Sequence, residues 1–561
     1  MKMKEGTMRI ATLQLNFTIG DVLGNSRKIQ DGYAKAVADG ADLVVTSELA
    51  LLGYPPKDLL EREDLIQQQD DELQNLATKI GHTPLIVGVA ERNPGEGKLL
   101  YNAAIMLQEG EVTDVRARKQ LLPTYDVFDE HRHFEPWKEG TLVAEISGER
   151  VGVLICEDIW AGSESETTRV YEEDPTDILK GHADVLIVLN ASPYYLGKGD
   201  VREELVVDLA KRLNMPVVYA NQVGGNDDLI FDGRSFAVDG VGRVIAAAKP
   251  FVEEVLHIDT TSDKETSSEK EVLYPHDGED LEQLRRALVL GIADYVSKTG
   301  AFSGGATLGL SGGIDSALVA ALAVEALGKD AVKAVAMPSK FSSEGSVLDA
   351  EALAENLGIE LLHIPIDDAY SAFGEMLRSP IGWEEPVEVT EENVQSRIRG
   401  LTLMAISNRE GRIVLGTGNK SEFAMGYATL YGDMAAGLLV IADLPKTLVY
   451  RLAEHINKDG EIIPRNTIEK PPSAELRPDQ VDTDSLPPYE VLDPLLHDYV
   501  EERLGPKALV AKGHDPQLVE RIIAAVDRTE FKRRQAAPGL RVTGKAFGGG
   551  RRLPIAAKVN I

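Results

Sequence analysis

A polar segment in the middle of the chain separates two series of short apolar runs. The segment, residues 260–280, reads TTSDKETSSEKEVLYPHDGED and is poor in apolar side chains, as a solvated linker is. The chain has 561 residues, more than the roughly 250 to 300 that one hydrophobic core usually serves. We therefore expect two domains, residues 8–259 and 281–561, joined by this linker.

The first series alternates apolar runs with helical patterns. Runs such as ADLVVTSE, RVGVLICED and ADVLIVLN are typical of buried strands, and amphipathic stretches lie between them. Two further stretches, YNAAIMLQEGEV and RSFAVDGVGRVIAAA, indicate antiparallel pairs of strands. Because sheets must cover their apolar faces, this pattern predicts an α/β fold in which two sheets pack together between helices, an α-β-β-α sandwich.

The second series has the same alternation without the hairpin signals. ATLGLSGG, AVKAVAMP, IELLHIPI and GRIVLGTG each combine an apolar run with a turn, and helical patterns follow them. This order predicts a doubly wound, mostly parallel sheet. Residues 470–493 are rich in Pro and Asp and show no periodicity. An irregular stretch of that length in a compact domain is often functional, so we expect a lid.

Composition excludes some classes of function. The chain carries 91 acidic and 59 basic residues, a formal charge of −32, which disfavours binding to nucleic acid or to anionic membranes. No apolar run reaches the roughly 18 residues of a membrane span, and the N-terminus lacks the apolar region of a signal peptide. We expect a cytoplasmic protein. Its one cysteine, Cys156, cannot form an intramolecular disulfide.

A glycine loop stands between a strand and a helix in the second domain. Paired glycines let the backbone approach phosphate oxygens, and a helix N-terminus attracts negative charge. The loop lacks the lysine of a Walker motif and the spacing of a dinucleotide fold. A tight turn with a polar helix cap is the alternative. The predicted phosphate site comprises Gly309, Leu310, Ser311, Gly312, Gly313, Ile314, Asp315 and Ser316.

Two carboxylates follow the strand RIVLGTG of the second domain. Glu422 comes shortly after it and Asp433 one helix later. Carboxylates near the end of a strand can hold Mg²⁺, which prefers oxygen ligands and substrate phosphates. Each alone could equally be a solvated helix residue.

Three residues of the first domain are candidates for covalent chemistry. Cys156 lies where the strand RVGVLI ends, Glu48 ends the strand ADLVVTSE, and Lys119 ends the charged run VRARK. Strand ends are where α/β enzymes place reactive groups. Taken singly, the cysteine could be inert and buried, and the two charges could be on the surface.

Motifs of the second domain carry a family resemblance. GLSGGIDS resembles the signature of ATP pyrophosphatases, and NVQSRIR, GTGNKSE, GDMAAG, LPKT and KPPSAEL follow in the order of the NAD⁺ synthetase family, over residues 281–561. The resemblance implies the adenine nucleotide alpha hydrolase-like fold. It also implies that Thr417 joins the glycine loop in binding ATP and that Asp315 and Glu422 hold Mg²⁺. The implied deamido-NAD⁺ contacts are Asn393, Glu422 and Lys532, and Arg399, Asp433 and Lys446 complete the nucleotide and phosphate site.

Motifs of the first domain carry a second resemblance. SELALLGYPP, RKQLLP and ICEDIW resemble the nitrilase superfamily over residues 8–259. This resemblance implies that Glu48 is the general base, Cys156 the nucleophile and Lys119 the cation that stabilises the oxyanion. It further implies that glutamine is bound by Tyr125, Ser192 and Lys198.

Together the halves resemble the glutamine-dependent members of the NAD⁺ synthetase family. The resemblance implies a ligase in which ATP adenylates the nicotinate carboxylate of deamido-NAD⁺, and ammonia from L-glutamine displaces AMP. The expected products are NAD⁺, AMP, diphosphate and L-glutamate. The family also implies a homo-oligomer and a tunnel for ammonia.

Three alternatives remain at this point. One is a nitrilase-type amidohydrolase whose second domain binds nucleotide only as a regulator. Another is an ATP pyrophosphatase that amidates or thiolates a nucleobase or a tRNA, although the acidic surface disfavours tRNA. The last is a scaffold that senses nucleotides without catalysis. Turnover of ATP to AMP would exclude the first.

Overall fold

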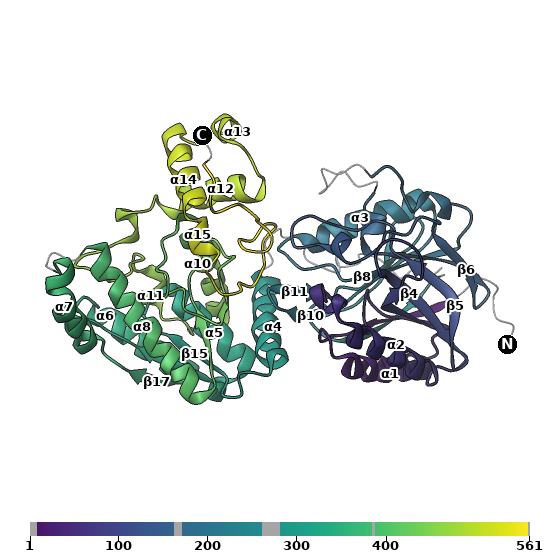
Figure 1. Ribbon diagram of the computed structural model, residues 1–561, viewed down its shortest axis with the longest axis horizontal. Coiled ribbons are helices and arrows are strands. Elements are labelled where there is room, and N and C mark those ends of the chain that lie inside the picture. Colours follow the sequence, from purple (N-terminus) through teal and green to yellow (C-terminus); the bar gives the residue numbers. More distant parts are fainter. Residues whose placement is uncertain (1–7, 162–170, 261–280, 384–387, 559–561) are drawn as a thin grey trace. The chain divides into compact units, whose positions relative to one another are not determined.

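The chain forms two compact units, residues 1–280 and 281–561. The computed structural model describes residues 8–161, 171–260, 281–383 and 388–558 (Figure 1). Most of the predicted linker therefore lies outside the described residues. The domain bounds given above remain predictions.

Two six-stranded sheets form the first unit. The first sheet has the order β14-β1-β2-β3-β4-β5, with β1–β2–β3 parallel and the other pairs antiparallel. The second has the order β13-β12-β9-β8-β7-β6, with β7–β8–β9 parallel. The strands of the first sheet are β1 Arg9–Gln14, β2 Leu43–Val45, β3 Leu85–Arg92, β4 Leu100–Gln108, β5 Glu111–Arg118 and β14 Glu254–Asp259. Those of the second are β6 Leu142–Ile146, β7 Glu149–Ile155, β8 Val185–Asn190, β9 Val217–Asn221, β12 Phe236–Val238 and β13 Val244–Ala247.

Alternation along the central strands builds the layers of this unit. Successive side chains of a strand point to opposite faces, so neighbours enter different cores. Val153 and Ile187 pack with residues of the first sheet, whereas Leu154 and Val188 pack with helix α3. Helices α1 (Val22–Ala38) and α2 (Glu63–Ala77) cover the other side, and α3 is Lys198–Leu213 (Figure 1). The predicted α-β-β-α sandwich is confirmed.

One parallel sheet organises the second unit. Its order is β17-β16-β15-β18-β19, and all of its neighbouring strands are parallel. The chain starts in the centre, winds to one edge, and then returns to the other side of β15, which confirms the predicted doubly wound sheet. The switch point between β15 and β18 is where such folds bind ligands, outside the carboxyl ends of the strands. The strands are β15 Ala306–Gly309, β16 Val332–Ala336, β17 Glu360–His363, β18 Ile413–Gly416 and β19 Leu438–Leu439.

Helices pack around this sheet. Helix α5 is buried along most of its length and packs with α4 and α10, and α8 contributes Ile398 and Leu403 to a core shared with Val335 and Val414. The longer helices are α4 Leu281–Thr299, α5 Ile314–Leu327, α6 Glu344–Leu357, α7 Asp367–Ile381, α8 Val389–Glu410, α10 Lys446–Ile456, α12 Tyr489–Leu496 and α14 Pro516–Arg528. The shorter ones are α9 Lys420–Met425, α11 Arg465–Glu469, α13 Pro506–Lys512 and α15 Glu530–Arg533.

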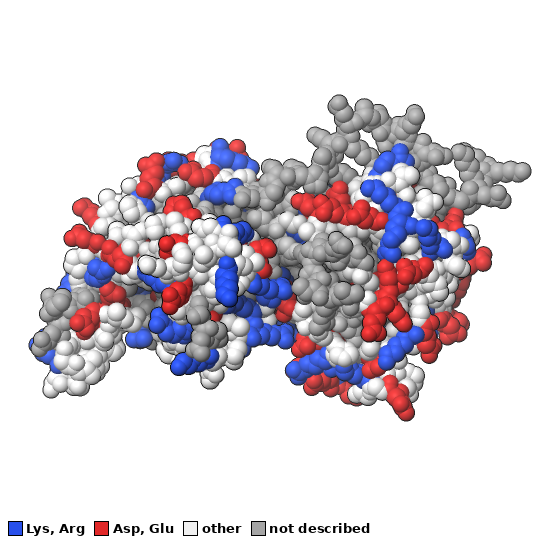
Figure 2. All heavy atoms as spheres, turned by 90° about the horizontal axis from the view of Figure 1, so that it is seen from above, with Lys and Arg blue, Asp and Glu red and all other residues white. Residues whose placement is uncertain are grey.

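Charges of both signs are spread over the surface. Figure 2 shows acidic and basic side chains intermixed on the visible face of each unit. Within the described residues, no helix combines the length and the apolar character that a membrane crossing requires.

Candidate active sites

The single cysteine occupies a strained turn at the end of a central strand. Cys156 follows β7, begins a short 3-10 helix (Cys156–Ile159), and has a φ of +46°. A non-glycine residue rarely adopts this conformation unless its surroundings hold it. Here the buried Asp158 carboxylate accepts hydrogen bonds from the backbone N–H groups of Ile155, Gln120 and Leu121, at 2.8–3.1 Å. The turn with the cysteine is thereby tied to the segment that carries Lys119.

Lys119 is enclosed by two carboxylates. Its Nζ donates to Glu48 Oε1 at 2.7 Å and to both Glu130 oxygens, at 2.8 and 2.7 Å, and its side chain is fully buried. Burial alone would lower the pKa of Lys119, but the charges of Glu130 and Glu48 outweigh it and raise that pKa well above its ordinary value. The lysine is therefore a permanent cation beside the cysteine.

Glu48 follows β2 and is held by neutral donors as well. Asn102 Nδ2 donates to Oε1 at 2.7 Å, and the Ala191 N–H donates to Oε2 at 3.0 Å. Burial, followed by the charge of Glu48, raises the pKa of the Cys156 thiol, although Lys119 opposes this. The resting thiol is therefore protonated, and a base is required before it can attack.

Glu130 was missed by the sequence reasoning. It begins a 3-10 helix (Glu130–Arg132), and besides Lys119 it is bound by the Tyr54 hydroxyl at 2.8 Å. Burial raises the pKa of Glu130 to about 7, against the lowering effect of Lys119. In the sequence it stands in the charged run DEHRHF, where nothing distinguishes it from a surface residue.

The predicted glutamine residues lie around the cysteine turn. The Tyr125 hydroxyl donates to both oxygens of Glu157, at 3.2 and 2.9 Å. Lys198 begins α3 and is buried, with its Nζ 4.4 Å from the ring centre of Trp160. Ser192 follows β8; its N–H donates to Asn221 at 2.9 Å, and its Oγ accepts from Arg202 Nε at 3.1 Å. Sequence reasoning did not identify Glu157 or Arg202 as neighbours of this set.

The glycine loop of the second unit joins β15 to α5. Gly312 has a φ of +77°, and a Cβ at this position would lie 2.2 Å from the Ser346 carbonyl oxygen. Only glycine fits there without displacing backbone. Ser316 Oγ donates to the Gly313 carbonyl at 3.0 Å and lies 3.2 Å from Ser311 Oγ. These contacts fix the shape of the loop at the N-terminus of α5.

Two carboxylates meet one ammonium beside the loop. The Lys446 Nζ forms an ion pair with Asp315 and lies 3.7 Å from Glu422 Oε1, and Asn419 Nδ2 donates to Asp315 at 3.2 Å. Burial and the nearby Asp315 raise the pKa of Glu422 to about 8, although Lys446 lowers it. Two acidic groups that share one cation can accept further positive charge, as a divalent ion would supply.

A cavity of about 330 Å³ opens at this point. Its lining residues come from the ends of β15 and β18 and from residues 470–476 and 482 of the predicted lid. The half-buried Arg399 also faces it; partial burial lowers the pKa of its guanidinium to about 10. The predicted site residues in the lining are Gly309, Leu310, Ser311, Gly313, Ile314, Asp315, Ser316, Arg399, Thr417, Glu422, Asp433 and Lys446.

Gly312, Asn393 and Lys532 are not part of this lining within the described chain. Asn393 Oδ1 accepts a hydrogen bond from Thr429 Oγ1 at 2.8 Å. Lys532 Nζ donates to the carbonyl groups of Gly426 and Ala428, at 2.8 and 2.7 Å. Both side chains hold the segment between α9 and Asp433. Sequence reasoning placed Lys470, Glu475 and Asp482 in the predicted lid without naming them as site residues, and the fold brings all three to the cavity.

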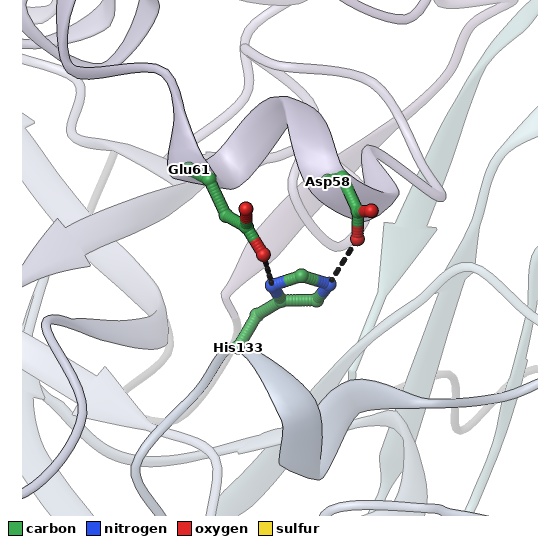
Figure 3. A group of neighbouring side chains, drawn as sticks. All are labelled: Asp58, Glu61 and His133. Atoms are coloured by element: carbon green, nitrogen blue, oxygen red, sulfur yellow. Dashed lines mark ion pairs between the residues drawn. The ribbon is translucent and has the colours of Figure 1, made fainter.

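A second charged cluster lies at the short helix Lys57–Glu61 of the first unit. Figure 3 shows the His133 ring between two carboxylates, with Nε2 3.3 Å from Asp58 and Nδ1 4.0 Å from Glu61. The carboxylates face different ring nitrogens, whereas an imidazole offers only one nitrogen to a given metal ion. Since Arg132 also pairs with Asp58 at 3.3 Å, the cluster joins two surface segments by ion pairs.

Comparisons with known proteins cover both units. The carbon-nitrogen hydrolase family matches residues 9–267, and the NAD synthase family matches residues 284–536. A glutamine-dependent NAD(+) synthetase of Synechocystis sp. is 48% identical over 557 residues, and one of Thermotoga maritima is 41% identical over 580 residues, with 98% of each chain covered in both comparisons.

A solved structure agrees over the same length. Glutamine-dependent NAD⁺ synthetase from Acinetobacter baumannii, in complex with adenosine diphosphate, matches with a TM-score of 0.76 and 37% identity, and 98% of both chains is covered. Because these matches cover both domains, they exclude the three alternatives left by the sequence: an amidohydrolase with a regulatory domain, an ATP pyrophosphatase that modifies a nucleobase or a tRNA, and a non-catalytic scaffold. The chain belongs to the glutamine-dependent NAD⁺ synthetases.

Proposed function

We propose that the residues described above divide the reaction between the two units, with ammonia released at Cys156 and consumed beside the Ser311–Ser316 loop. The single observation that carries this proposal is that one chain holds both a buried Glu48–Lys119 pair beside its only cysteine and a phosphate loop beside Asp315, Glu422 and Lys446. The first set suits acyl transfer from an amide, and the second suits nucleotide chemistry.

In the first unit, Glu48 takes the proton of the Cys156 thiol as the sulfur attacks the side-chain amide of L-glutamine. Lys119 stabilises the negative charge that develops on the carbonyl oxygen. Glu48 then returns the proton to the leaving nitrogen; the carbon–nitrogen bond of the tetrahedral intermediate breaks, and ammonia departs, leaving a thioester on Cys156. Water hydrolyses the thioester to L-glutamate, again with Glu48 as the base.

Tyr125, Ser192 and Lys198 bind the amino-acid end of glutamine in this proposal. Lys198 supplies a buried positive charge for the α-carboxylate. Ser192 accepts from Arg202, which can only donate, so the serine hydroxyl acts as a hydrogen-bond donor at this position. Loops at strand ends commonly carry such binding groups on a rigid sheet.

In the second unit, the loop Gly309–Ser316 and Thr417 bind ATP. The proposed deamido-NAD⁺ residues are Asn393, Glu422 and Lys532, and Arg399, Asp433 and Lys446 serve the phosphates. Asn393 and Lys532 act through the 426–429 segment that they bind, according to the contacts above. The Acinetobacter baumannii relative was solved in complex with adenosine diphosphate, which supports the binding of an adenine nucleotide.

Asp315 and Glu422 are the proposed Mg²⁺ ligands. Both are carboxylates at the mouth of the phosphate loop, and they share one lysine, so the donor set fits a hard divalent cation. When bound, Mg²⁺ would neutralise the charge of the departing diphosphate. Lys446 then remains a cation for phosphate oxygens.

We also propose a homo-oligomer. Helices α7 and α8 expose large apolar side chains, among them Met376, Val389 and Leu401, with exposed fractions of 59%, 69% and 67%. Exposed apolar surface of this kind often marks a protein interface. Light scattering of the purified chain measures the mass directly, and a monomer would contradict the proposal.

The function is tested by supplying each nitrogen donor separately. Purified protein with ATP, Mg²⁺ and deamido-NAD⁺ is given L-glutamine or ammonium, and NAD⁺, AMP and L-glutamate are quantified. We expect NAD⁺ from both donors and one AMP per NAD⁺. Formation of ADP in place of AMP, or no NAD⁺ with either donor, would contradict the assigned chemistry.

A further inference from the structure

A buried carboxylate stands directly beside the nucleophile. Glu157 follows Cys156 in the 3-10 helix, and only 3% of its surface is exposed. Its oxygens accept hydrogen bonds from two phenols, Tyr171 at 2.6 Å and Tyr125 at 2.9 Å. Both donors are neutral, so they orient the carboxylate without cancelling its charge.

The neighbouring cations are engaged elsewhere. Lys119 is bonded to Glu48 and Glu130, and the Lys198 ammonium lies over the rings of Trp160 and Tyr195, at 4.4 and 5.1 Å. Burial raises the pKa of Glu157. The hydrogen bonds from the two tyrosines and the charges of the two lysines lower this pKa, but by less than burial raises it. A buried carboxylate in this position favours a cation brought by a ligand.

L-Glutamine carries such a cation. Its side-chain amide must reach Cys156, and its other end presents an α-carboxylate and an α-ammonium. The residues proposed above for that end, Tyr125, Ser192 and Lys198, offer hydroxyls and a positive charge, which suit the carboxylate. The ammonium needs a negative or strongly accepting partner once water is excluded.

We propose that Glu157 binds the α-ammonium of L-glutamine and thereby selects a zwitterionic amino acid over other primary amides. The proposal rests on the proposed function of the Cys156 site. Glu157 and Lys198 then form a complementary pair of charges, one for each end group of the substrate. Tyr125, which donates to Glu157, positions the carboxylate between them.

A purely structural role for Glu157 predicts a different result. If the residue only held Tyr125 and Tyr171 in place, its loss would impair every amide substrate to the same degree. Recognition of the ammonium instead affects only substrates that carry one. Glutaramate, which is glutamine with hydrogen in place of the α-ammonium, separates the two roles.

The test measures kcat/KM for ammonia release from L-glutamine and from glutaramate in wild type and Glu157→Gln. We expect the variant to lose about 10- to 100-fold with glutamine, the range of a charged hydrogen bond, and to change little with glutaramate. The ratio of inhibition constants for L-glutamate and glutarate reports the same preference if glutaramate reacts too slowly. An unchanged preference in Glu157→Gln would overturn the proposal.

Two controls keep the outcome specific. Glu72→Gln removes another buried carboxylate of the first unit, one that accepts from Asn75 on α2, and should leave the preference unchanged. If Glu157→Gln does not fold, Glu157→Asp retracts the charge and should reduce the preference by a smaller factor. If wild type makes NAD⁺ only from ammonium, the proposed function itself is contradicted. If wild type uses glutamine but Glu157→Gln keeps the same preference for L-glutamine over glutaramate, only the role of Glu157 is contradicted.

Discussion

The two active sites treat buried charge in different ways. In the first unit, Lys119 is completely enclosed and bonded to Glu48 and Glu130, so these charges balance within the protein. In the second, Lys446 is buried and shares two carboxylates, but the half-buried Arg399 faces a cavity of about 330 Å³, where a ligand can reach it. A small amide is activated by the protein's own groups, whereas a polyanionic substrate must meet positive charge that is still accessible.

The sharpest separation of the sites comes from Cys156→Ala. We expect NAD⁺ synthesis from glutamine to fall by at least about 10³-fold, because no other nucleophile replaces the thiolate. Synthesis from ammonium should stay close to wild type. Both rates are read from NAD⁺ formation, and an equal loss with both donors would show that the sites do not act separately.

Lys119→Met tests whether charges in the first unit are balanced internally. Two buried carboxylates would lose their ammonium, which should destabilise this unit by about 3–5 kcal/mol. Urea unfolding followed by tryptophan fluorescence measures the effect, since Trp137 and Trp160 lie in this unit. A variant as stable as wild type would mean that solvent, and not Lys119, balances Glu48 and Glu130.

Asp315→Asn probes the open site. Loss of a proposed Mg²⁺ ligand beside the phosphate loop should lower NAD⁺ synthesis by about 10²- to 10³-fold, the range seen when one electrostatic contact to a transition state is removed. The loss should be the same for glutamine and for ammonium. Glutamine hydrolysis at Cys156 serves as the internal control, and a selective loss with glutamine would contradict the assignment.

Gly312→Ala tests the shape of the phosphate loop. With a φ of +77° and a backbone oxygen 2.2 Å from the new Cβ, the loop must shift, at a cost of about 1–3 kcal/mol. We expect a lower rate from ammonium and a higher KM for ATP. Gly345→Ala is the matched control, because a Cβ there meets nothing within 4 Å.

The smallest expected effect concerns Glu501, which is not among the described residues that line the cavity. Burial alone would raise the pKa of Glu501, but the lowering effects of His497 and Lys420 are larger, and the net pKa is about 2. Because this pKa is depressed, the stabilisation is complete above the ordinary value of 4.5 and is lost as the pH falls toward 2. Calorimetry should show that wild type exceeds Glu501→Gln by roughly 1–3 kcal/mol near pH 6 and that this margin shrinks between pH 4.5 and 3. If the stability difference between wild type and Glu501→Gln did not change with pH, ionisation of Glu501 would not be its source.

Local patterns were enough to predict most of the fold. Alternation in RVGVLICED and ADVLIVLN indicated central strands, and the glycine loop after ATLGL indicated a ligand site at a strand end. Such signals depend on backbone periodicity and turn chemistry, which neighbouring residues determine. The reaction class was implied by the resemblance of the motifs at those strand ends to known families.

Contacts between distant residues could not be predicted in this way. Glu48 and Lys119 meet across 71 positions, and Asp315 and Lys446 across 131. Glu130 had no periodic or motif signal, and Glu157 stood in the ICEDIW motif without an assigned role, yet the fold buries both carboxylates near Cys156. The carbonyl partners of Lys532 are likewise set by how α15 packs beside the 426–428 segment.

The sequence by itself therefore determined the two α/β folds, the family and the residue types of both sites. Only the tertiary structure decided which carboxylates surround Lys119, which side chains line the nucleotide cavity, and that the buried Glu157 carboxylate accepts from two neutral donors, Tyr125 and Tyr171. The physical reason is that strand order and layer packing bring these groups together. Once they are buried, each charge must be paired, because an uncompensated charge in a protein interior costs free energy.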